Sequence, residues 1–238
     1  MYAFGPIPQQ KRSGHIIGTH QKIDRVARRH LQKRLSDDLP FPDIASILHF
    51  EGSRGPDGIK MKSPGRDEPW HFIDPDHITE DDPLLTAITD HSHNLTAALK
   101  SRNHERAAFE AAWLAHAVAD GLTPAHHEPL QEQVKDLRAN DHRQHSFRSR
   151  IIMTGDGSRK QFVQNNWRYW GAKGVMTTHT LFEAGIATTT KPLSFSGVEL
   201  DDVAIKQLDD IGFMPIYRDM ISQVAEMDMY EAFKANGW

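Results

Sequence analysis

Histidines and acidic residues at helical spacing are the most informative chemical feature of this sequence. His116 and Asp120 lie four residues apart within the apolar stretch from Ala112 to Leu122. A helix would carry both side chains on one face, about 6 Å apart. The apolar neighbours predict that this face is buried, and a buried imidazole and carboxylate need partners, which a metal ion can supply. A hydrogen-bonded structural pair is the alternative that one such spacing leaves open.

Two further features favour the metal interpretation. Gly121 and Pro124 predict the end of this helix, and the chain then presents His126 just beyond the turn. His179 and Glu183 repeat the spacing of four residues, again with apolar neighbours. Two rigid helices would then each offer one nitrogen and one oxygen ligand.

The composition restricts which metal sites are possible. The chain has no cysteine, which excludes disulfides, thiolate nucleophiles, iron–sulfur clusters and zinc held by sulfur. It has 15 histidines among 238 residues, an excess that points to nitrogen ligands. Any bound metal is therefore expected to have nitrogen and oxygen ligands only.

Charge and hydropathy exclude other classes of protein. The net charge of −4 does not favour general attraction to DNA or membranes, although residues 132–173 hold nine Lys or Arg against four Asp or Glu. No apolar run approaches the roughly 20 residues of a membrane span. The first residues, Met1 to Pro6, lack the features of an export signal. We expect a cytoplasmic protein without a transmembrane segment, and no protein partner is inferred.

Helical periodicity dominates the chain, which predicts an all-α fold, a compact multi-helix single domain over residues 1–238. The first expected helix has an apolar stripe of Ile17, Ile23, Val26, Ala27 and Leu31. The turn-rich segment 51–83 is expected to form a long loop between the early helices, with a metal cleft nearby. The expected helices cover residues 17–35, 43–48, 84–100, 105–119, 128–140, 162–187, 199–211 and 215–234.

Trp167 and Trp170 lie in the 162–187 segment beside Arg168 and Tyr169. Aromatic residues at helical spacing favour packing in the core, and the alternatives are a stacking platform for bases or a wedge against lipid headgroups. Asp74 and Asp76 are candidates either for holding ligating imidazoles or for capping a turn. The remaining histidines are assigned to surface or capping roles: His30, His49, His77, His91, His93 and His104.

The pattern resembles the superfamily of zinc-dependent phospholipases C and single-strand nucleases. The resemblance rests on His116, Asp120 and His126 as His-x3-Asp-x5-His, and on His179 and Glu183 as a later His-x3-Glu. The remaining anchors occur upstream in the order of the family: Gly18-Thr19-His20, Pro56-Asp57 and the segment Trp70 to Asp76, which contains His71. Together the anchors span about two thirds of the chain, from His20 to Glu183.

The resemblance implies an all-helical fold with up to three zinc ions in one cleft. It implies one zinc at Asp57, His71, His116 and Asp120, and a second at His20 and the bridging Asp120. The third would be held by His126, His179 and Glu183. Asp57 is also a candidate catalytic base toward the attacking water, although a carboxylate bound to zinc is a poor base.

Three departures from the family pattern leave alternatives open. The chain begins with Met1, where family members use the amino group of a processed tryptophan, so the second site lacks a ligand that His15 is a candidate to replace. The 53 residues from His126 to His179 form a long gap, in which His142 and His145 are competing ligands. His127 competes with its neighbour His126.

The resemblance implies phosphodiester hydrolysis, since closely spaced cations activate water and neutralise charge at phosphorus. The segment Trp70 to Asp76 favours a phospholipid substrate, and the basic segment 132–173 supports single-stranded nucleic acid. A third hypothesis is a non-catalytic, metal-stabilised module that binds phosphate.

Overall fold

The computed structural model describes residues 19–35, 40–51, 54–56, 71–128, 137, 152–153 and 158–237. Within these ranges every regular element is a helix, which confirms the predicted all-α class. No helix in the described ranges combines the length and the apolar character that crossing a membrane requires. The helices are α1 (Thr19–Gln32), α2 (Ile44–His49), α4 (Pro83–Lys100), α5 (His104–Gly121), α8 (Arg159–Trp170), α9 (Val175–Thr190), α10 (Asp202–Ile211), α11 (Phe213–Ala225) and α12 (Met229–Asn236), with short 3-10 turns η3 (Pro75–His77) and η4 (Pro124–His126).

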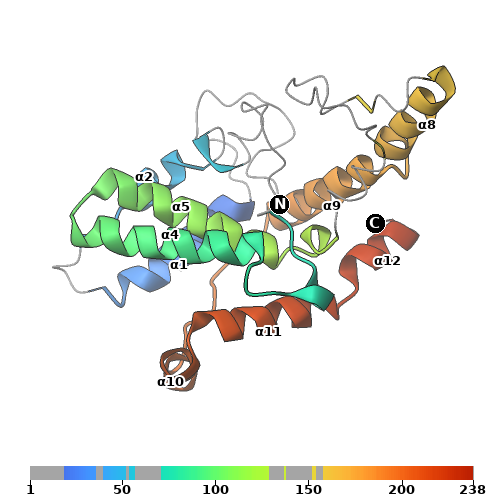
Figure 1. Cartoon of the computed structure of the whole chain (residues 1–238). Coiled ribbons are helices and arrows are strands. Elements are labelled where there is room, and N and C mark those ends of the chain that lie inside the picture. Colours follow the sequence, from blue (N-terminus) through green and yellow to red (C-terminus); the bar gives the residue numbers. More distant parts are fainter. Residues whose placement is uncertain are drawn as a thin grey trace.

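Helix α5 is the central element and contacts α1, α2, α4 and η4. Asn103 is its N-cap, with its side chain accepting a hydrogen bond from the Arg106 N–H. Alanines 108 and 112 are fully buried against Ile47 of α2, where their small side chains permit close packing. On another side, Leu84, Leu85 and Ile88 of α4 join Ala117 in the largest apolar cluster. Figure 1 shows α4 and α5 side by side, with α11 running along the outer side of the pair.

Tyr217 and Ile221 of α11 are both fully buried in that cluster. The Tyr217 hydroxyl donates to the Val118 carbonyl at 2.9 Å, close to the end of α5 where carbonyls lose their helical partners. A side chain at Gly121 would meet the same hydroxyl, because a Cβ built there lies 2.2 Å from the Tyr217 oxygen. Glycine at this position therefore permits the close approach of α11 to α5.

Two predicted helices are divided in the structure. The segment 162–187 forms α8 and α9, which are separated by the turn from Gly171 to Gly174. The segment 215–234 forms α11 and α12, separated at 226–228, where Asp228 adopts a left-handed conformation with φ of 50°. Met220 and Met227, whose helical spacing in the segment 215–234 indicates a buried side, are instead 41% and 61% exposed.

Two expected segments lie partly or almost entirely outside the described residues. The loop expected over 51–83 contains the turn η3, and its residues 52–53 and 57–70 lie outside the described part. The helix expected at 128–140 also falls almost entirely outside it.

Candidate metal centre

Helix α5 carries the first pair of candidate ligands at its buried C-terminal end. His116 and Asp120 are each 1% exposed, and His116 Nε2 lies 3.1 Å from Asp120 Oδ2. The i, i+4 spacing thus places both side chains on one buried face, as predicted. The turn after the helix is held by Thr123, whose hydroxyl donates to the Ala119 carbonyl and whose own carbonyl accepts from the His126 N–H.

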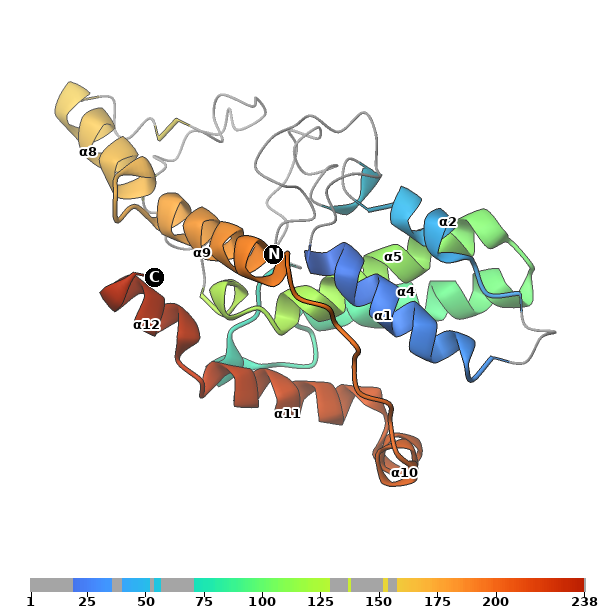
Figure 2. The same ribbon diagram turned by 180° about the vertical axis from the view of Figure 1, so that it is seen from behind.

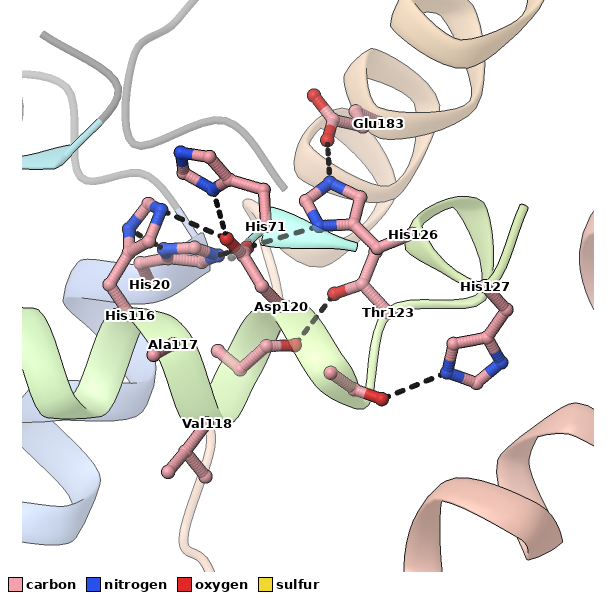
Figure 3. Close-up of polar contacts among 12 residues, drawn as sticks. His20, His71, His116, Ala117, Val118, Asp120, Thr123, His126, His127 and Glu183 are labelled. Carbon is pink, nitrogen blue, oxygen red and sulfur yellow. Dashed lines mark hydrogen bonds and ion pairs between the residues drawn. The ribbon is translucent and has the colours of Figure 1, made fainter. Parts of the chain in front are cut away.

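Four imidazoles surround the Asp120 carboxylate (Figure 3). Oδ2 lies 2.6 Å from His71 Nδ1 and 3.1 Å from His116 Nε2. Oδ1 lies 3.7 Å from His20 Nε2 and 3.5 Å from His126 Nδ1. His20, His116 and Asp120 form a buried group that could hold a metal ion. Asp120 thus lies among imidazoles from α1, α5, η4 and the segment before η3.

A second group of metal-binding side chains adjoins the first. His126 Nε2 lies 3.0 Å from Glu183 Oε1, and His179 Nε2 lies 3.3 Å from the same oxygen. The three side chains are buried and could hold a metal ion. His126 faces both groups, because its other nitrogen points to Asp120 (Figure 3). The group contains the same three residues that the resemblance implies for the third zinc.

Three buried polar atoms at the junction of the groups lack hydrogen bonds within the described structure. They are His20 Nε2, Asp120 Oδ1 and His126 Nδ1. Both nitrogens lie 3.5–3.7 Å from the same oxygen, too far for a hydrogen bond but suited to ligands around a cation. Leaving such groups buried and unsatisfied costs about 1–3 kcal/mol each. The donor set therefore fits a metal ion held by nitrogen and oxygen ligands.

The electrostatics of the site also suit a cation. Burial lowers the pKa of His20 well below its usual value, and the nearby His116 lowers it further. Burial likewise lowers the pKa of His126 to about 4. Burial alone would raise the pKa of Asp120, but His116 and His126 outweigh it and hold that pKa well below its ordinary value. Neutral imidazoles at His20 and His126 beside an ionised Asp120 are protonation states that bind metal.

Contacts between distant elements bring the ligands together. Lys22 of α1 donates to the carbonyls of Thr190 and Lys191 at 2.6 Å, which places a cation at the C-terminal end of α9. This contact fixes α1, which carries His20, against α9, which carries the second group; Figure 2 shows the two helices meeting there. The Ile73 N–H donates to the His126 carbonyl at 3.0 Å and so ties the His71 segment to η4.

Seven of the eight predicted metal ligands are described, and all seven lie in this one buried region: His20, His71, His116, Asp120, His126, His179 and Glu183. The eighth, Asp57, lies outside the described residues, as do the alternatives His15, His142 and His145. His127 points away from the cluster, and its ring bonds the Gly121 carbonyl at 2.8 Å. Asp74 caps η3 by accepting the Asp76 N–H, so the capping interpretation applies to Asp74.

The sequence interpretation missed two buried carboxyls beside the first group. They are Asp24, one turn after His20 on α1, and Glu51; the two are 6% and 3% exposed. Burial raises the pKa of Asp24 to about 7, although the neighbouring His116 opposes the shift. The signal was present, since His20 and Asp24 have the same spacing of four residues as the other two pairs.

Two expectations about residues outside the cluster are wrong. Trp167 and Trp170 do not pack in the core, because they are 71% and 44% exposed. His91, expected at the surface, is half-buried with its Nδ1 2.5 Å from the fully buried Glu110 carboxylate. A buried carboxylate needs such a partner, and His91 on the adjacent helix α4 supplies it.

Comparisons with protein-family models, with curated proteins and with solved structures found no match for this chain.

Proposed function

We propose that this protein is a zinc-dependent phosphodiester hydrolase of the phospholipase C type. The observation that carries the proposal is the convergence of His20 Nε2, His126 Nδ1 and Asp120 Oδ1, three buried atoms without hydrogen bonds at the junction of two ligand groups. Buried polar side chains with a purely structural role form hydrogen bonds with one another, whereas these three atoms lie close together without one. Adjacent ligand groups that share residues are the arrangement expected of a multi-zinc hydrolase.

Each residue has a defined part in this proposal. His20, His116 and Asp120 hold one ion with His71 beside them, and His126, His179 and Glu183 hold another; a third ion, with Asp57 as a ligand or base, is carried over from the family resemblance. Zinc bound at these groups supplies an activated water and neutralises charge on the phosphate oxygens. Asp120 keeps the surrounding imidazoles oriented toward the junction, and the apolar shell of Phe72 and Ala125 limits bulk water there.

The test is hydrolysis of bis(4-nitrophenyl) phosphate, a phosphatidylcholine and a single-stranded oligonucleotide, each with added zinc. We expect slow turnover of the generic ester, because activation of water does not depend on the leaving group, and a clear preference for the lipid. Asp120→Asn should lose this turnover, whereas Asp209→Asn, an exposed change on α10, should retain it.

Single-strand nuclease activity is the second candidate, favoured by the excess of Lys and Arg over residues 132–173. Preference for the oligonucleotide would establish it in place of lipid hydrolysis. No turnover of any of the three substrates, in a sample with its full metal content, would refute catalysis and favour a metal-stabilised phosphate-binding module.

A further inference from the structure

Helix α8 exposes most of its large apolar side chains to solvent, although an amphipathic helix usually buries them against the protein. Asn165 and Tyr169 are buried, and Asn165 donates to the Leu137 carbonyl at 2.8 Å. The outward face carries four large apolar side chains that are 41–71% exposed: Phe162, Val163, Trp167 and Trp170. These residues fall on one side of the helix at spacings of one, three, four and five residues.

The charged side chains of α8 and of the turn after it are all positive. Residues 157–182 contain no Asp or Glu, and the four cations among them are exposed: Arg159, Lys160, Arg168 and Lys173. Within the described part of the chain, none of the four is in an ion pair. Figure 1 shows α8 at one extremity of the molecule, where an extended surface can reach it. The face thus combines exposed tryptophans with exposed cations.

We propose that this face of α8, defined by Phe162, Val163, Trp167 and Trp170 with its surrounding cations, binds an anionic lipid surface. A helix with tryptophan and apolar residues on one side and Lys or Arg beside them lies in the interface between headgroups and acyl chains. Val163 is 66% exposed and offers no plane for stacking a base, so the face as a whole suits hydrocarbon better than single-stranded nucleic acid. The proposal concerns docking and is independent of the proposed hydrolysis.

The buried side of helix α8 packs toward the candidate metal centre. Tyr169, on the opposite side of α8, belongs to the same apolar cluster as Phe72. The Phe72 ring in turn lies 5.2 Å from the His126 ring and 6.1 Å from the His179 ring. The buried side of α8, opposite the proposed docking face, is therefore linked through this cluster to the second ligand group.

Co-sedimentation of the full chain with vesicles tests this proposal. We expect binding to vesicles of phosphatidylcholine mixed with phosphatidylserine, much weaker binding to pure phosphatidylcholine, and a loss on raising the salt concentration. Removing a cation near the surface should lower the partition coefficient about fivefold, so Lys160→Gln with Arg168→Gln should lower it about 25-fold. Trp167→Ser with Trp170→Ser should lower it tenfold or more.

Matched controls lie on α10, where Lys206→Gln and Val203→Ser change an exposed cation and a 75% exposed apolar residue. Both should bind vesicles like the unchanged chain, and circular dichroism should show that every variant is folded. The proposal is overturned if the mixed vesicles do not bind, or if the controls lose as much binding as the α8 variants. It is equally overturned if the tryptophans instead prove necessary for binding an oligonucleotide or for forming a dimer.

Discussion

Replacing Glu183 by glutamine isolates the contribution of the second ligand group. The side chain keeps its shape, but the ionised oxygen that lies 3.0 Å from His126 Nε2 and 3.3 Å from His179 Nε2 becomes a neutral amide atom. We expect one metal ion fewer per chain, because two imidazoles without a carboxylate hold zinc weakly. The first group, with Asp120, should keep its ion.

The magnitude follows from linkage between metal binding and folding. At a free zinc concentration 100 times the dissociation constant, one site stabilises the fold by about 2.7 kcal/mol. A 100-fold loss of affinity leaves only about 0.4 kcal/mol of this, so the variant loses about 2.3 kcal/mol. For a chain of this size, that corresponds to a fall in melting temperature of about 5–9 °C.

Thermal melting with zinc and with chelator separates metal loss from structural damage. With zinc, Glu183→Gln should melt below the unchanged chain, and with chelator the two should differ much less. Glu226→Gln, at an exposed position after α11, is the matched control and should change neither melt. If the fall in melting temperature is the same with chelator as with zinc, Glu183 stabilises the fold without a metal and the reasoning is refuted.

Three other predictions address the rest of the centre. Asp120→Asn should remove more metal than any other single ligand change, because it takes away the anion that both groups share. Mass spectrometry of the native protein measures the metal content. A variant that keeps its full metal content would show that Asp120 is not the bridging ligand. In chelated protein, His126 binds protons only below about pH 4 when folded but near pH 6.5 when unfolded, so stability should be lost as pH falls from about 6.5 to about 4. His126→Asn should lower the slope of unfolding free energy against pH by up to about 1.4 kcal/mol per pH unit, measured by urea unfolding at several pH values. An unchanged slope would exclude His126 as the source of this pH dependence. Tyr217→Phe should cost about 1 kcal/mol in urea unfolding through the lost bond to Val118, and no loss would show that this bond does not stabilise the end of α5.

Part of the candidate site could be predicted from the sequence because two of its ligand pairs are defined by the spacing of residues within single helices. A separation of four residues fixes His116 with Asp120 and His179 with Glu183 on single helix faces, whatever the tertiary fold. The relation between the two pairs could not be predicted from spacing alone. It depends on contacts across the chain, such as that of Lys22 with the end of α9.

Hydrophobic periodicity was a poorer guide to which faces are buried. The stripe expected to bury α1 includes Ile23, which is 36% exposed, while the polar side chains of His20, Gln21 and Asp24 are buried. Helix α8 is reversed in the same way, with Asn165 inside and Trp167 outside. On α1, the polar face turns inward because the His20 imidazole lies in the ligand cluster, 3.7 Å from the Asp120 carboxylate, and Asp24 is buried one turn later. A rule based on the spacing of apolar residues does not take such buried polar side chains into account.

The divided helices illustrate a second limit. Apolar residues continue at helical spacing through 226–228, so the sequence gives no break, yet Asp228 takes a left-handed conformation and starts a new helix. This conformation is reached by few residues other than glycine, asparagine and aspartate, and tertiary contacts decide when it occurs. Tyr230 and Phe233 of α12 pack against Phe182 of α9, which draws the chain away from the axis of α11.

Anomalous diffraction from crystals grown with zinc, recorded on both sides of the zinc absorption edge, tests the metal centre most directly. The account predicts one peak among His20, His116 and Asp120 and another among His126, His179 and Glu183, each with ligand distances of about 2.0–2.2 Å. A difference map without a peak at either group, from protein crystallised in excess zinc, would contradict the central claim.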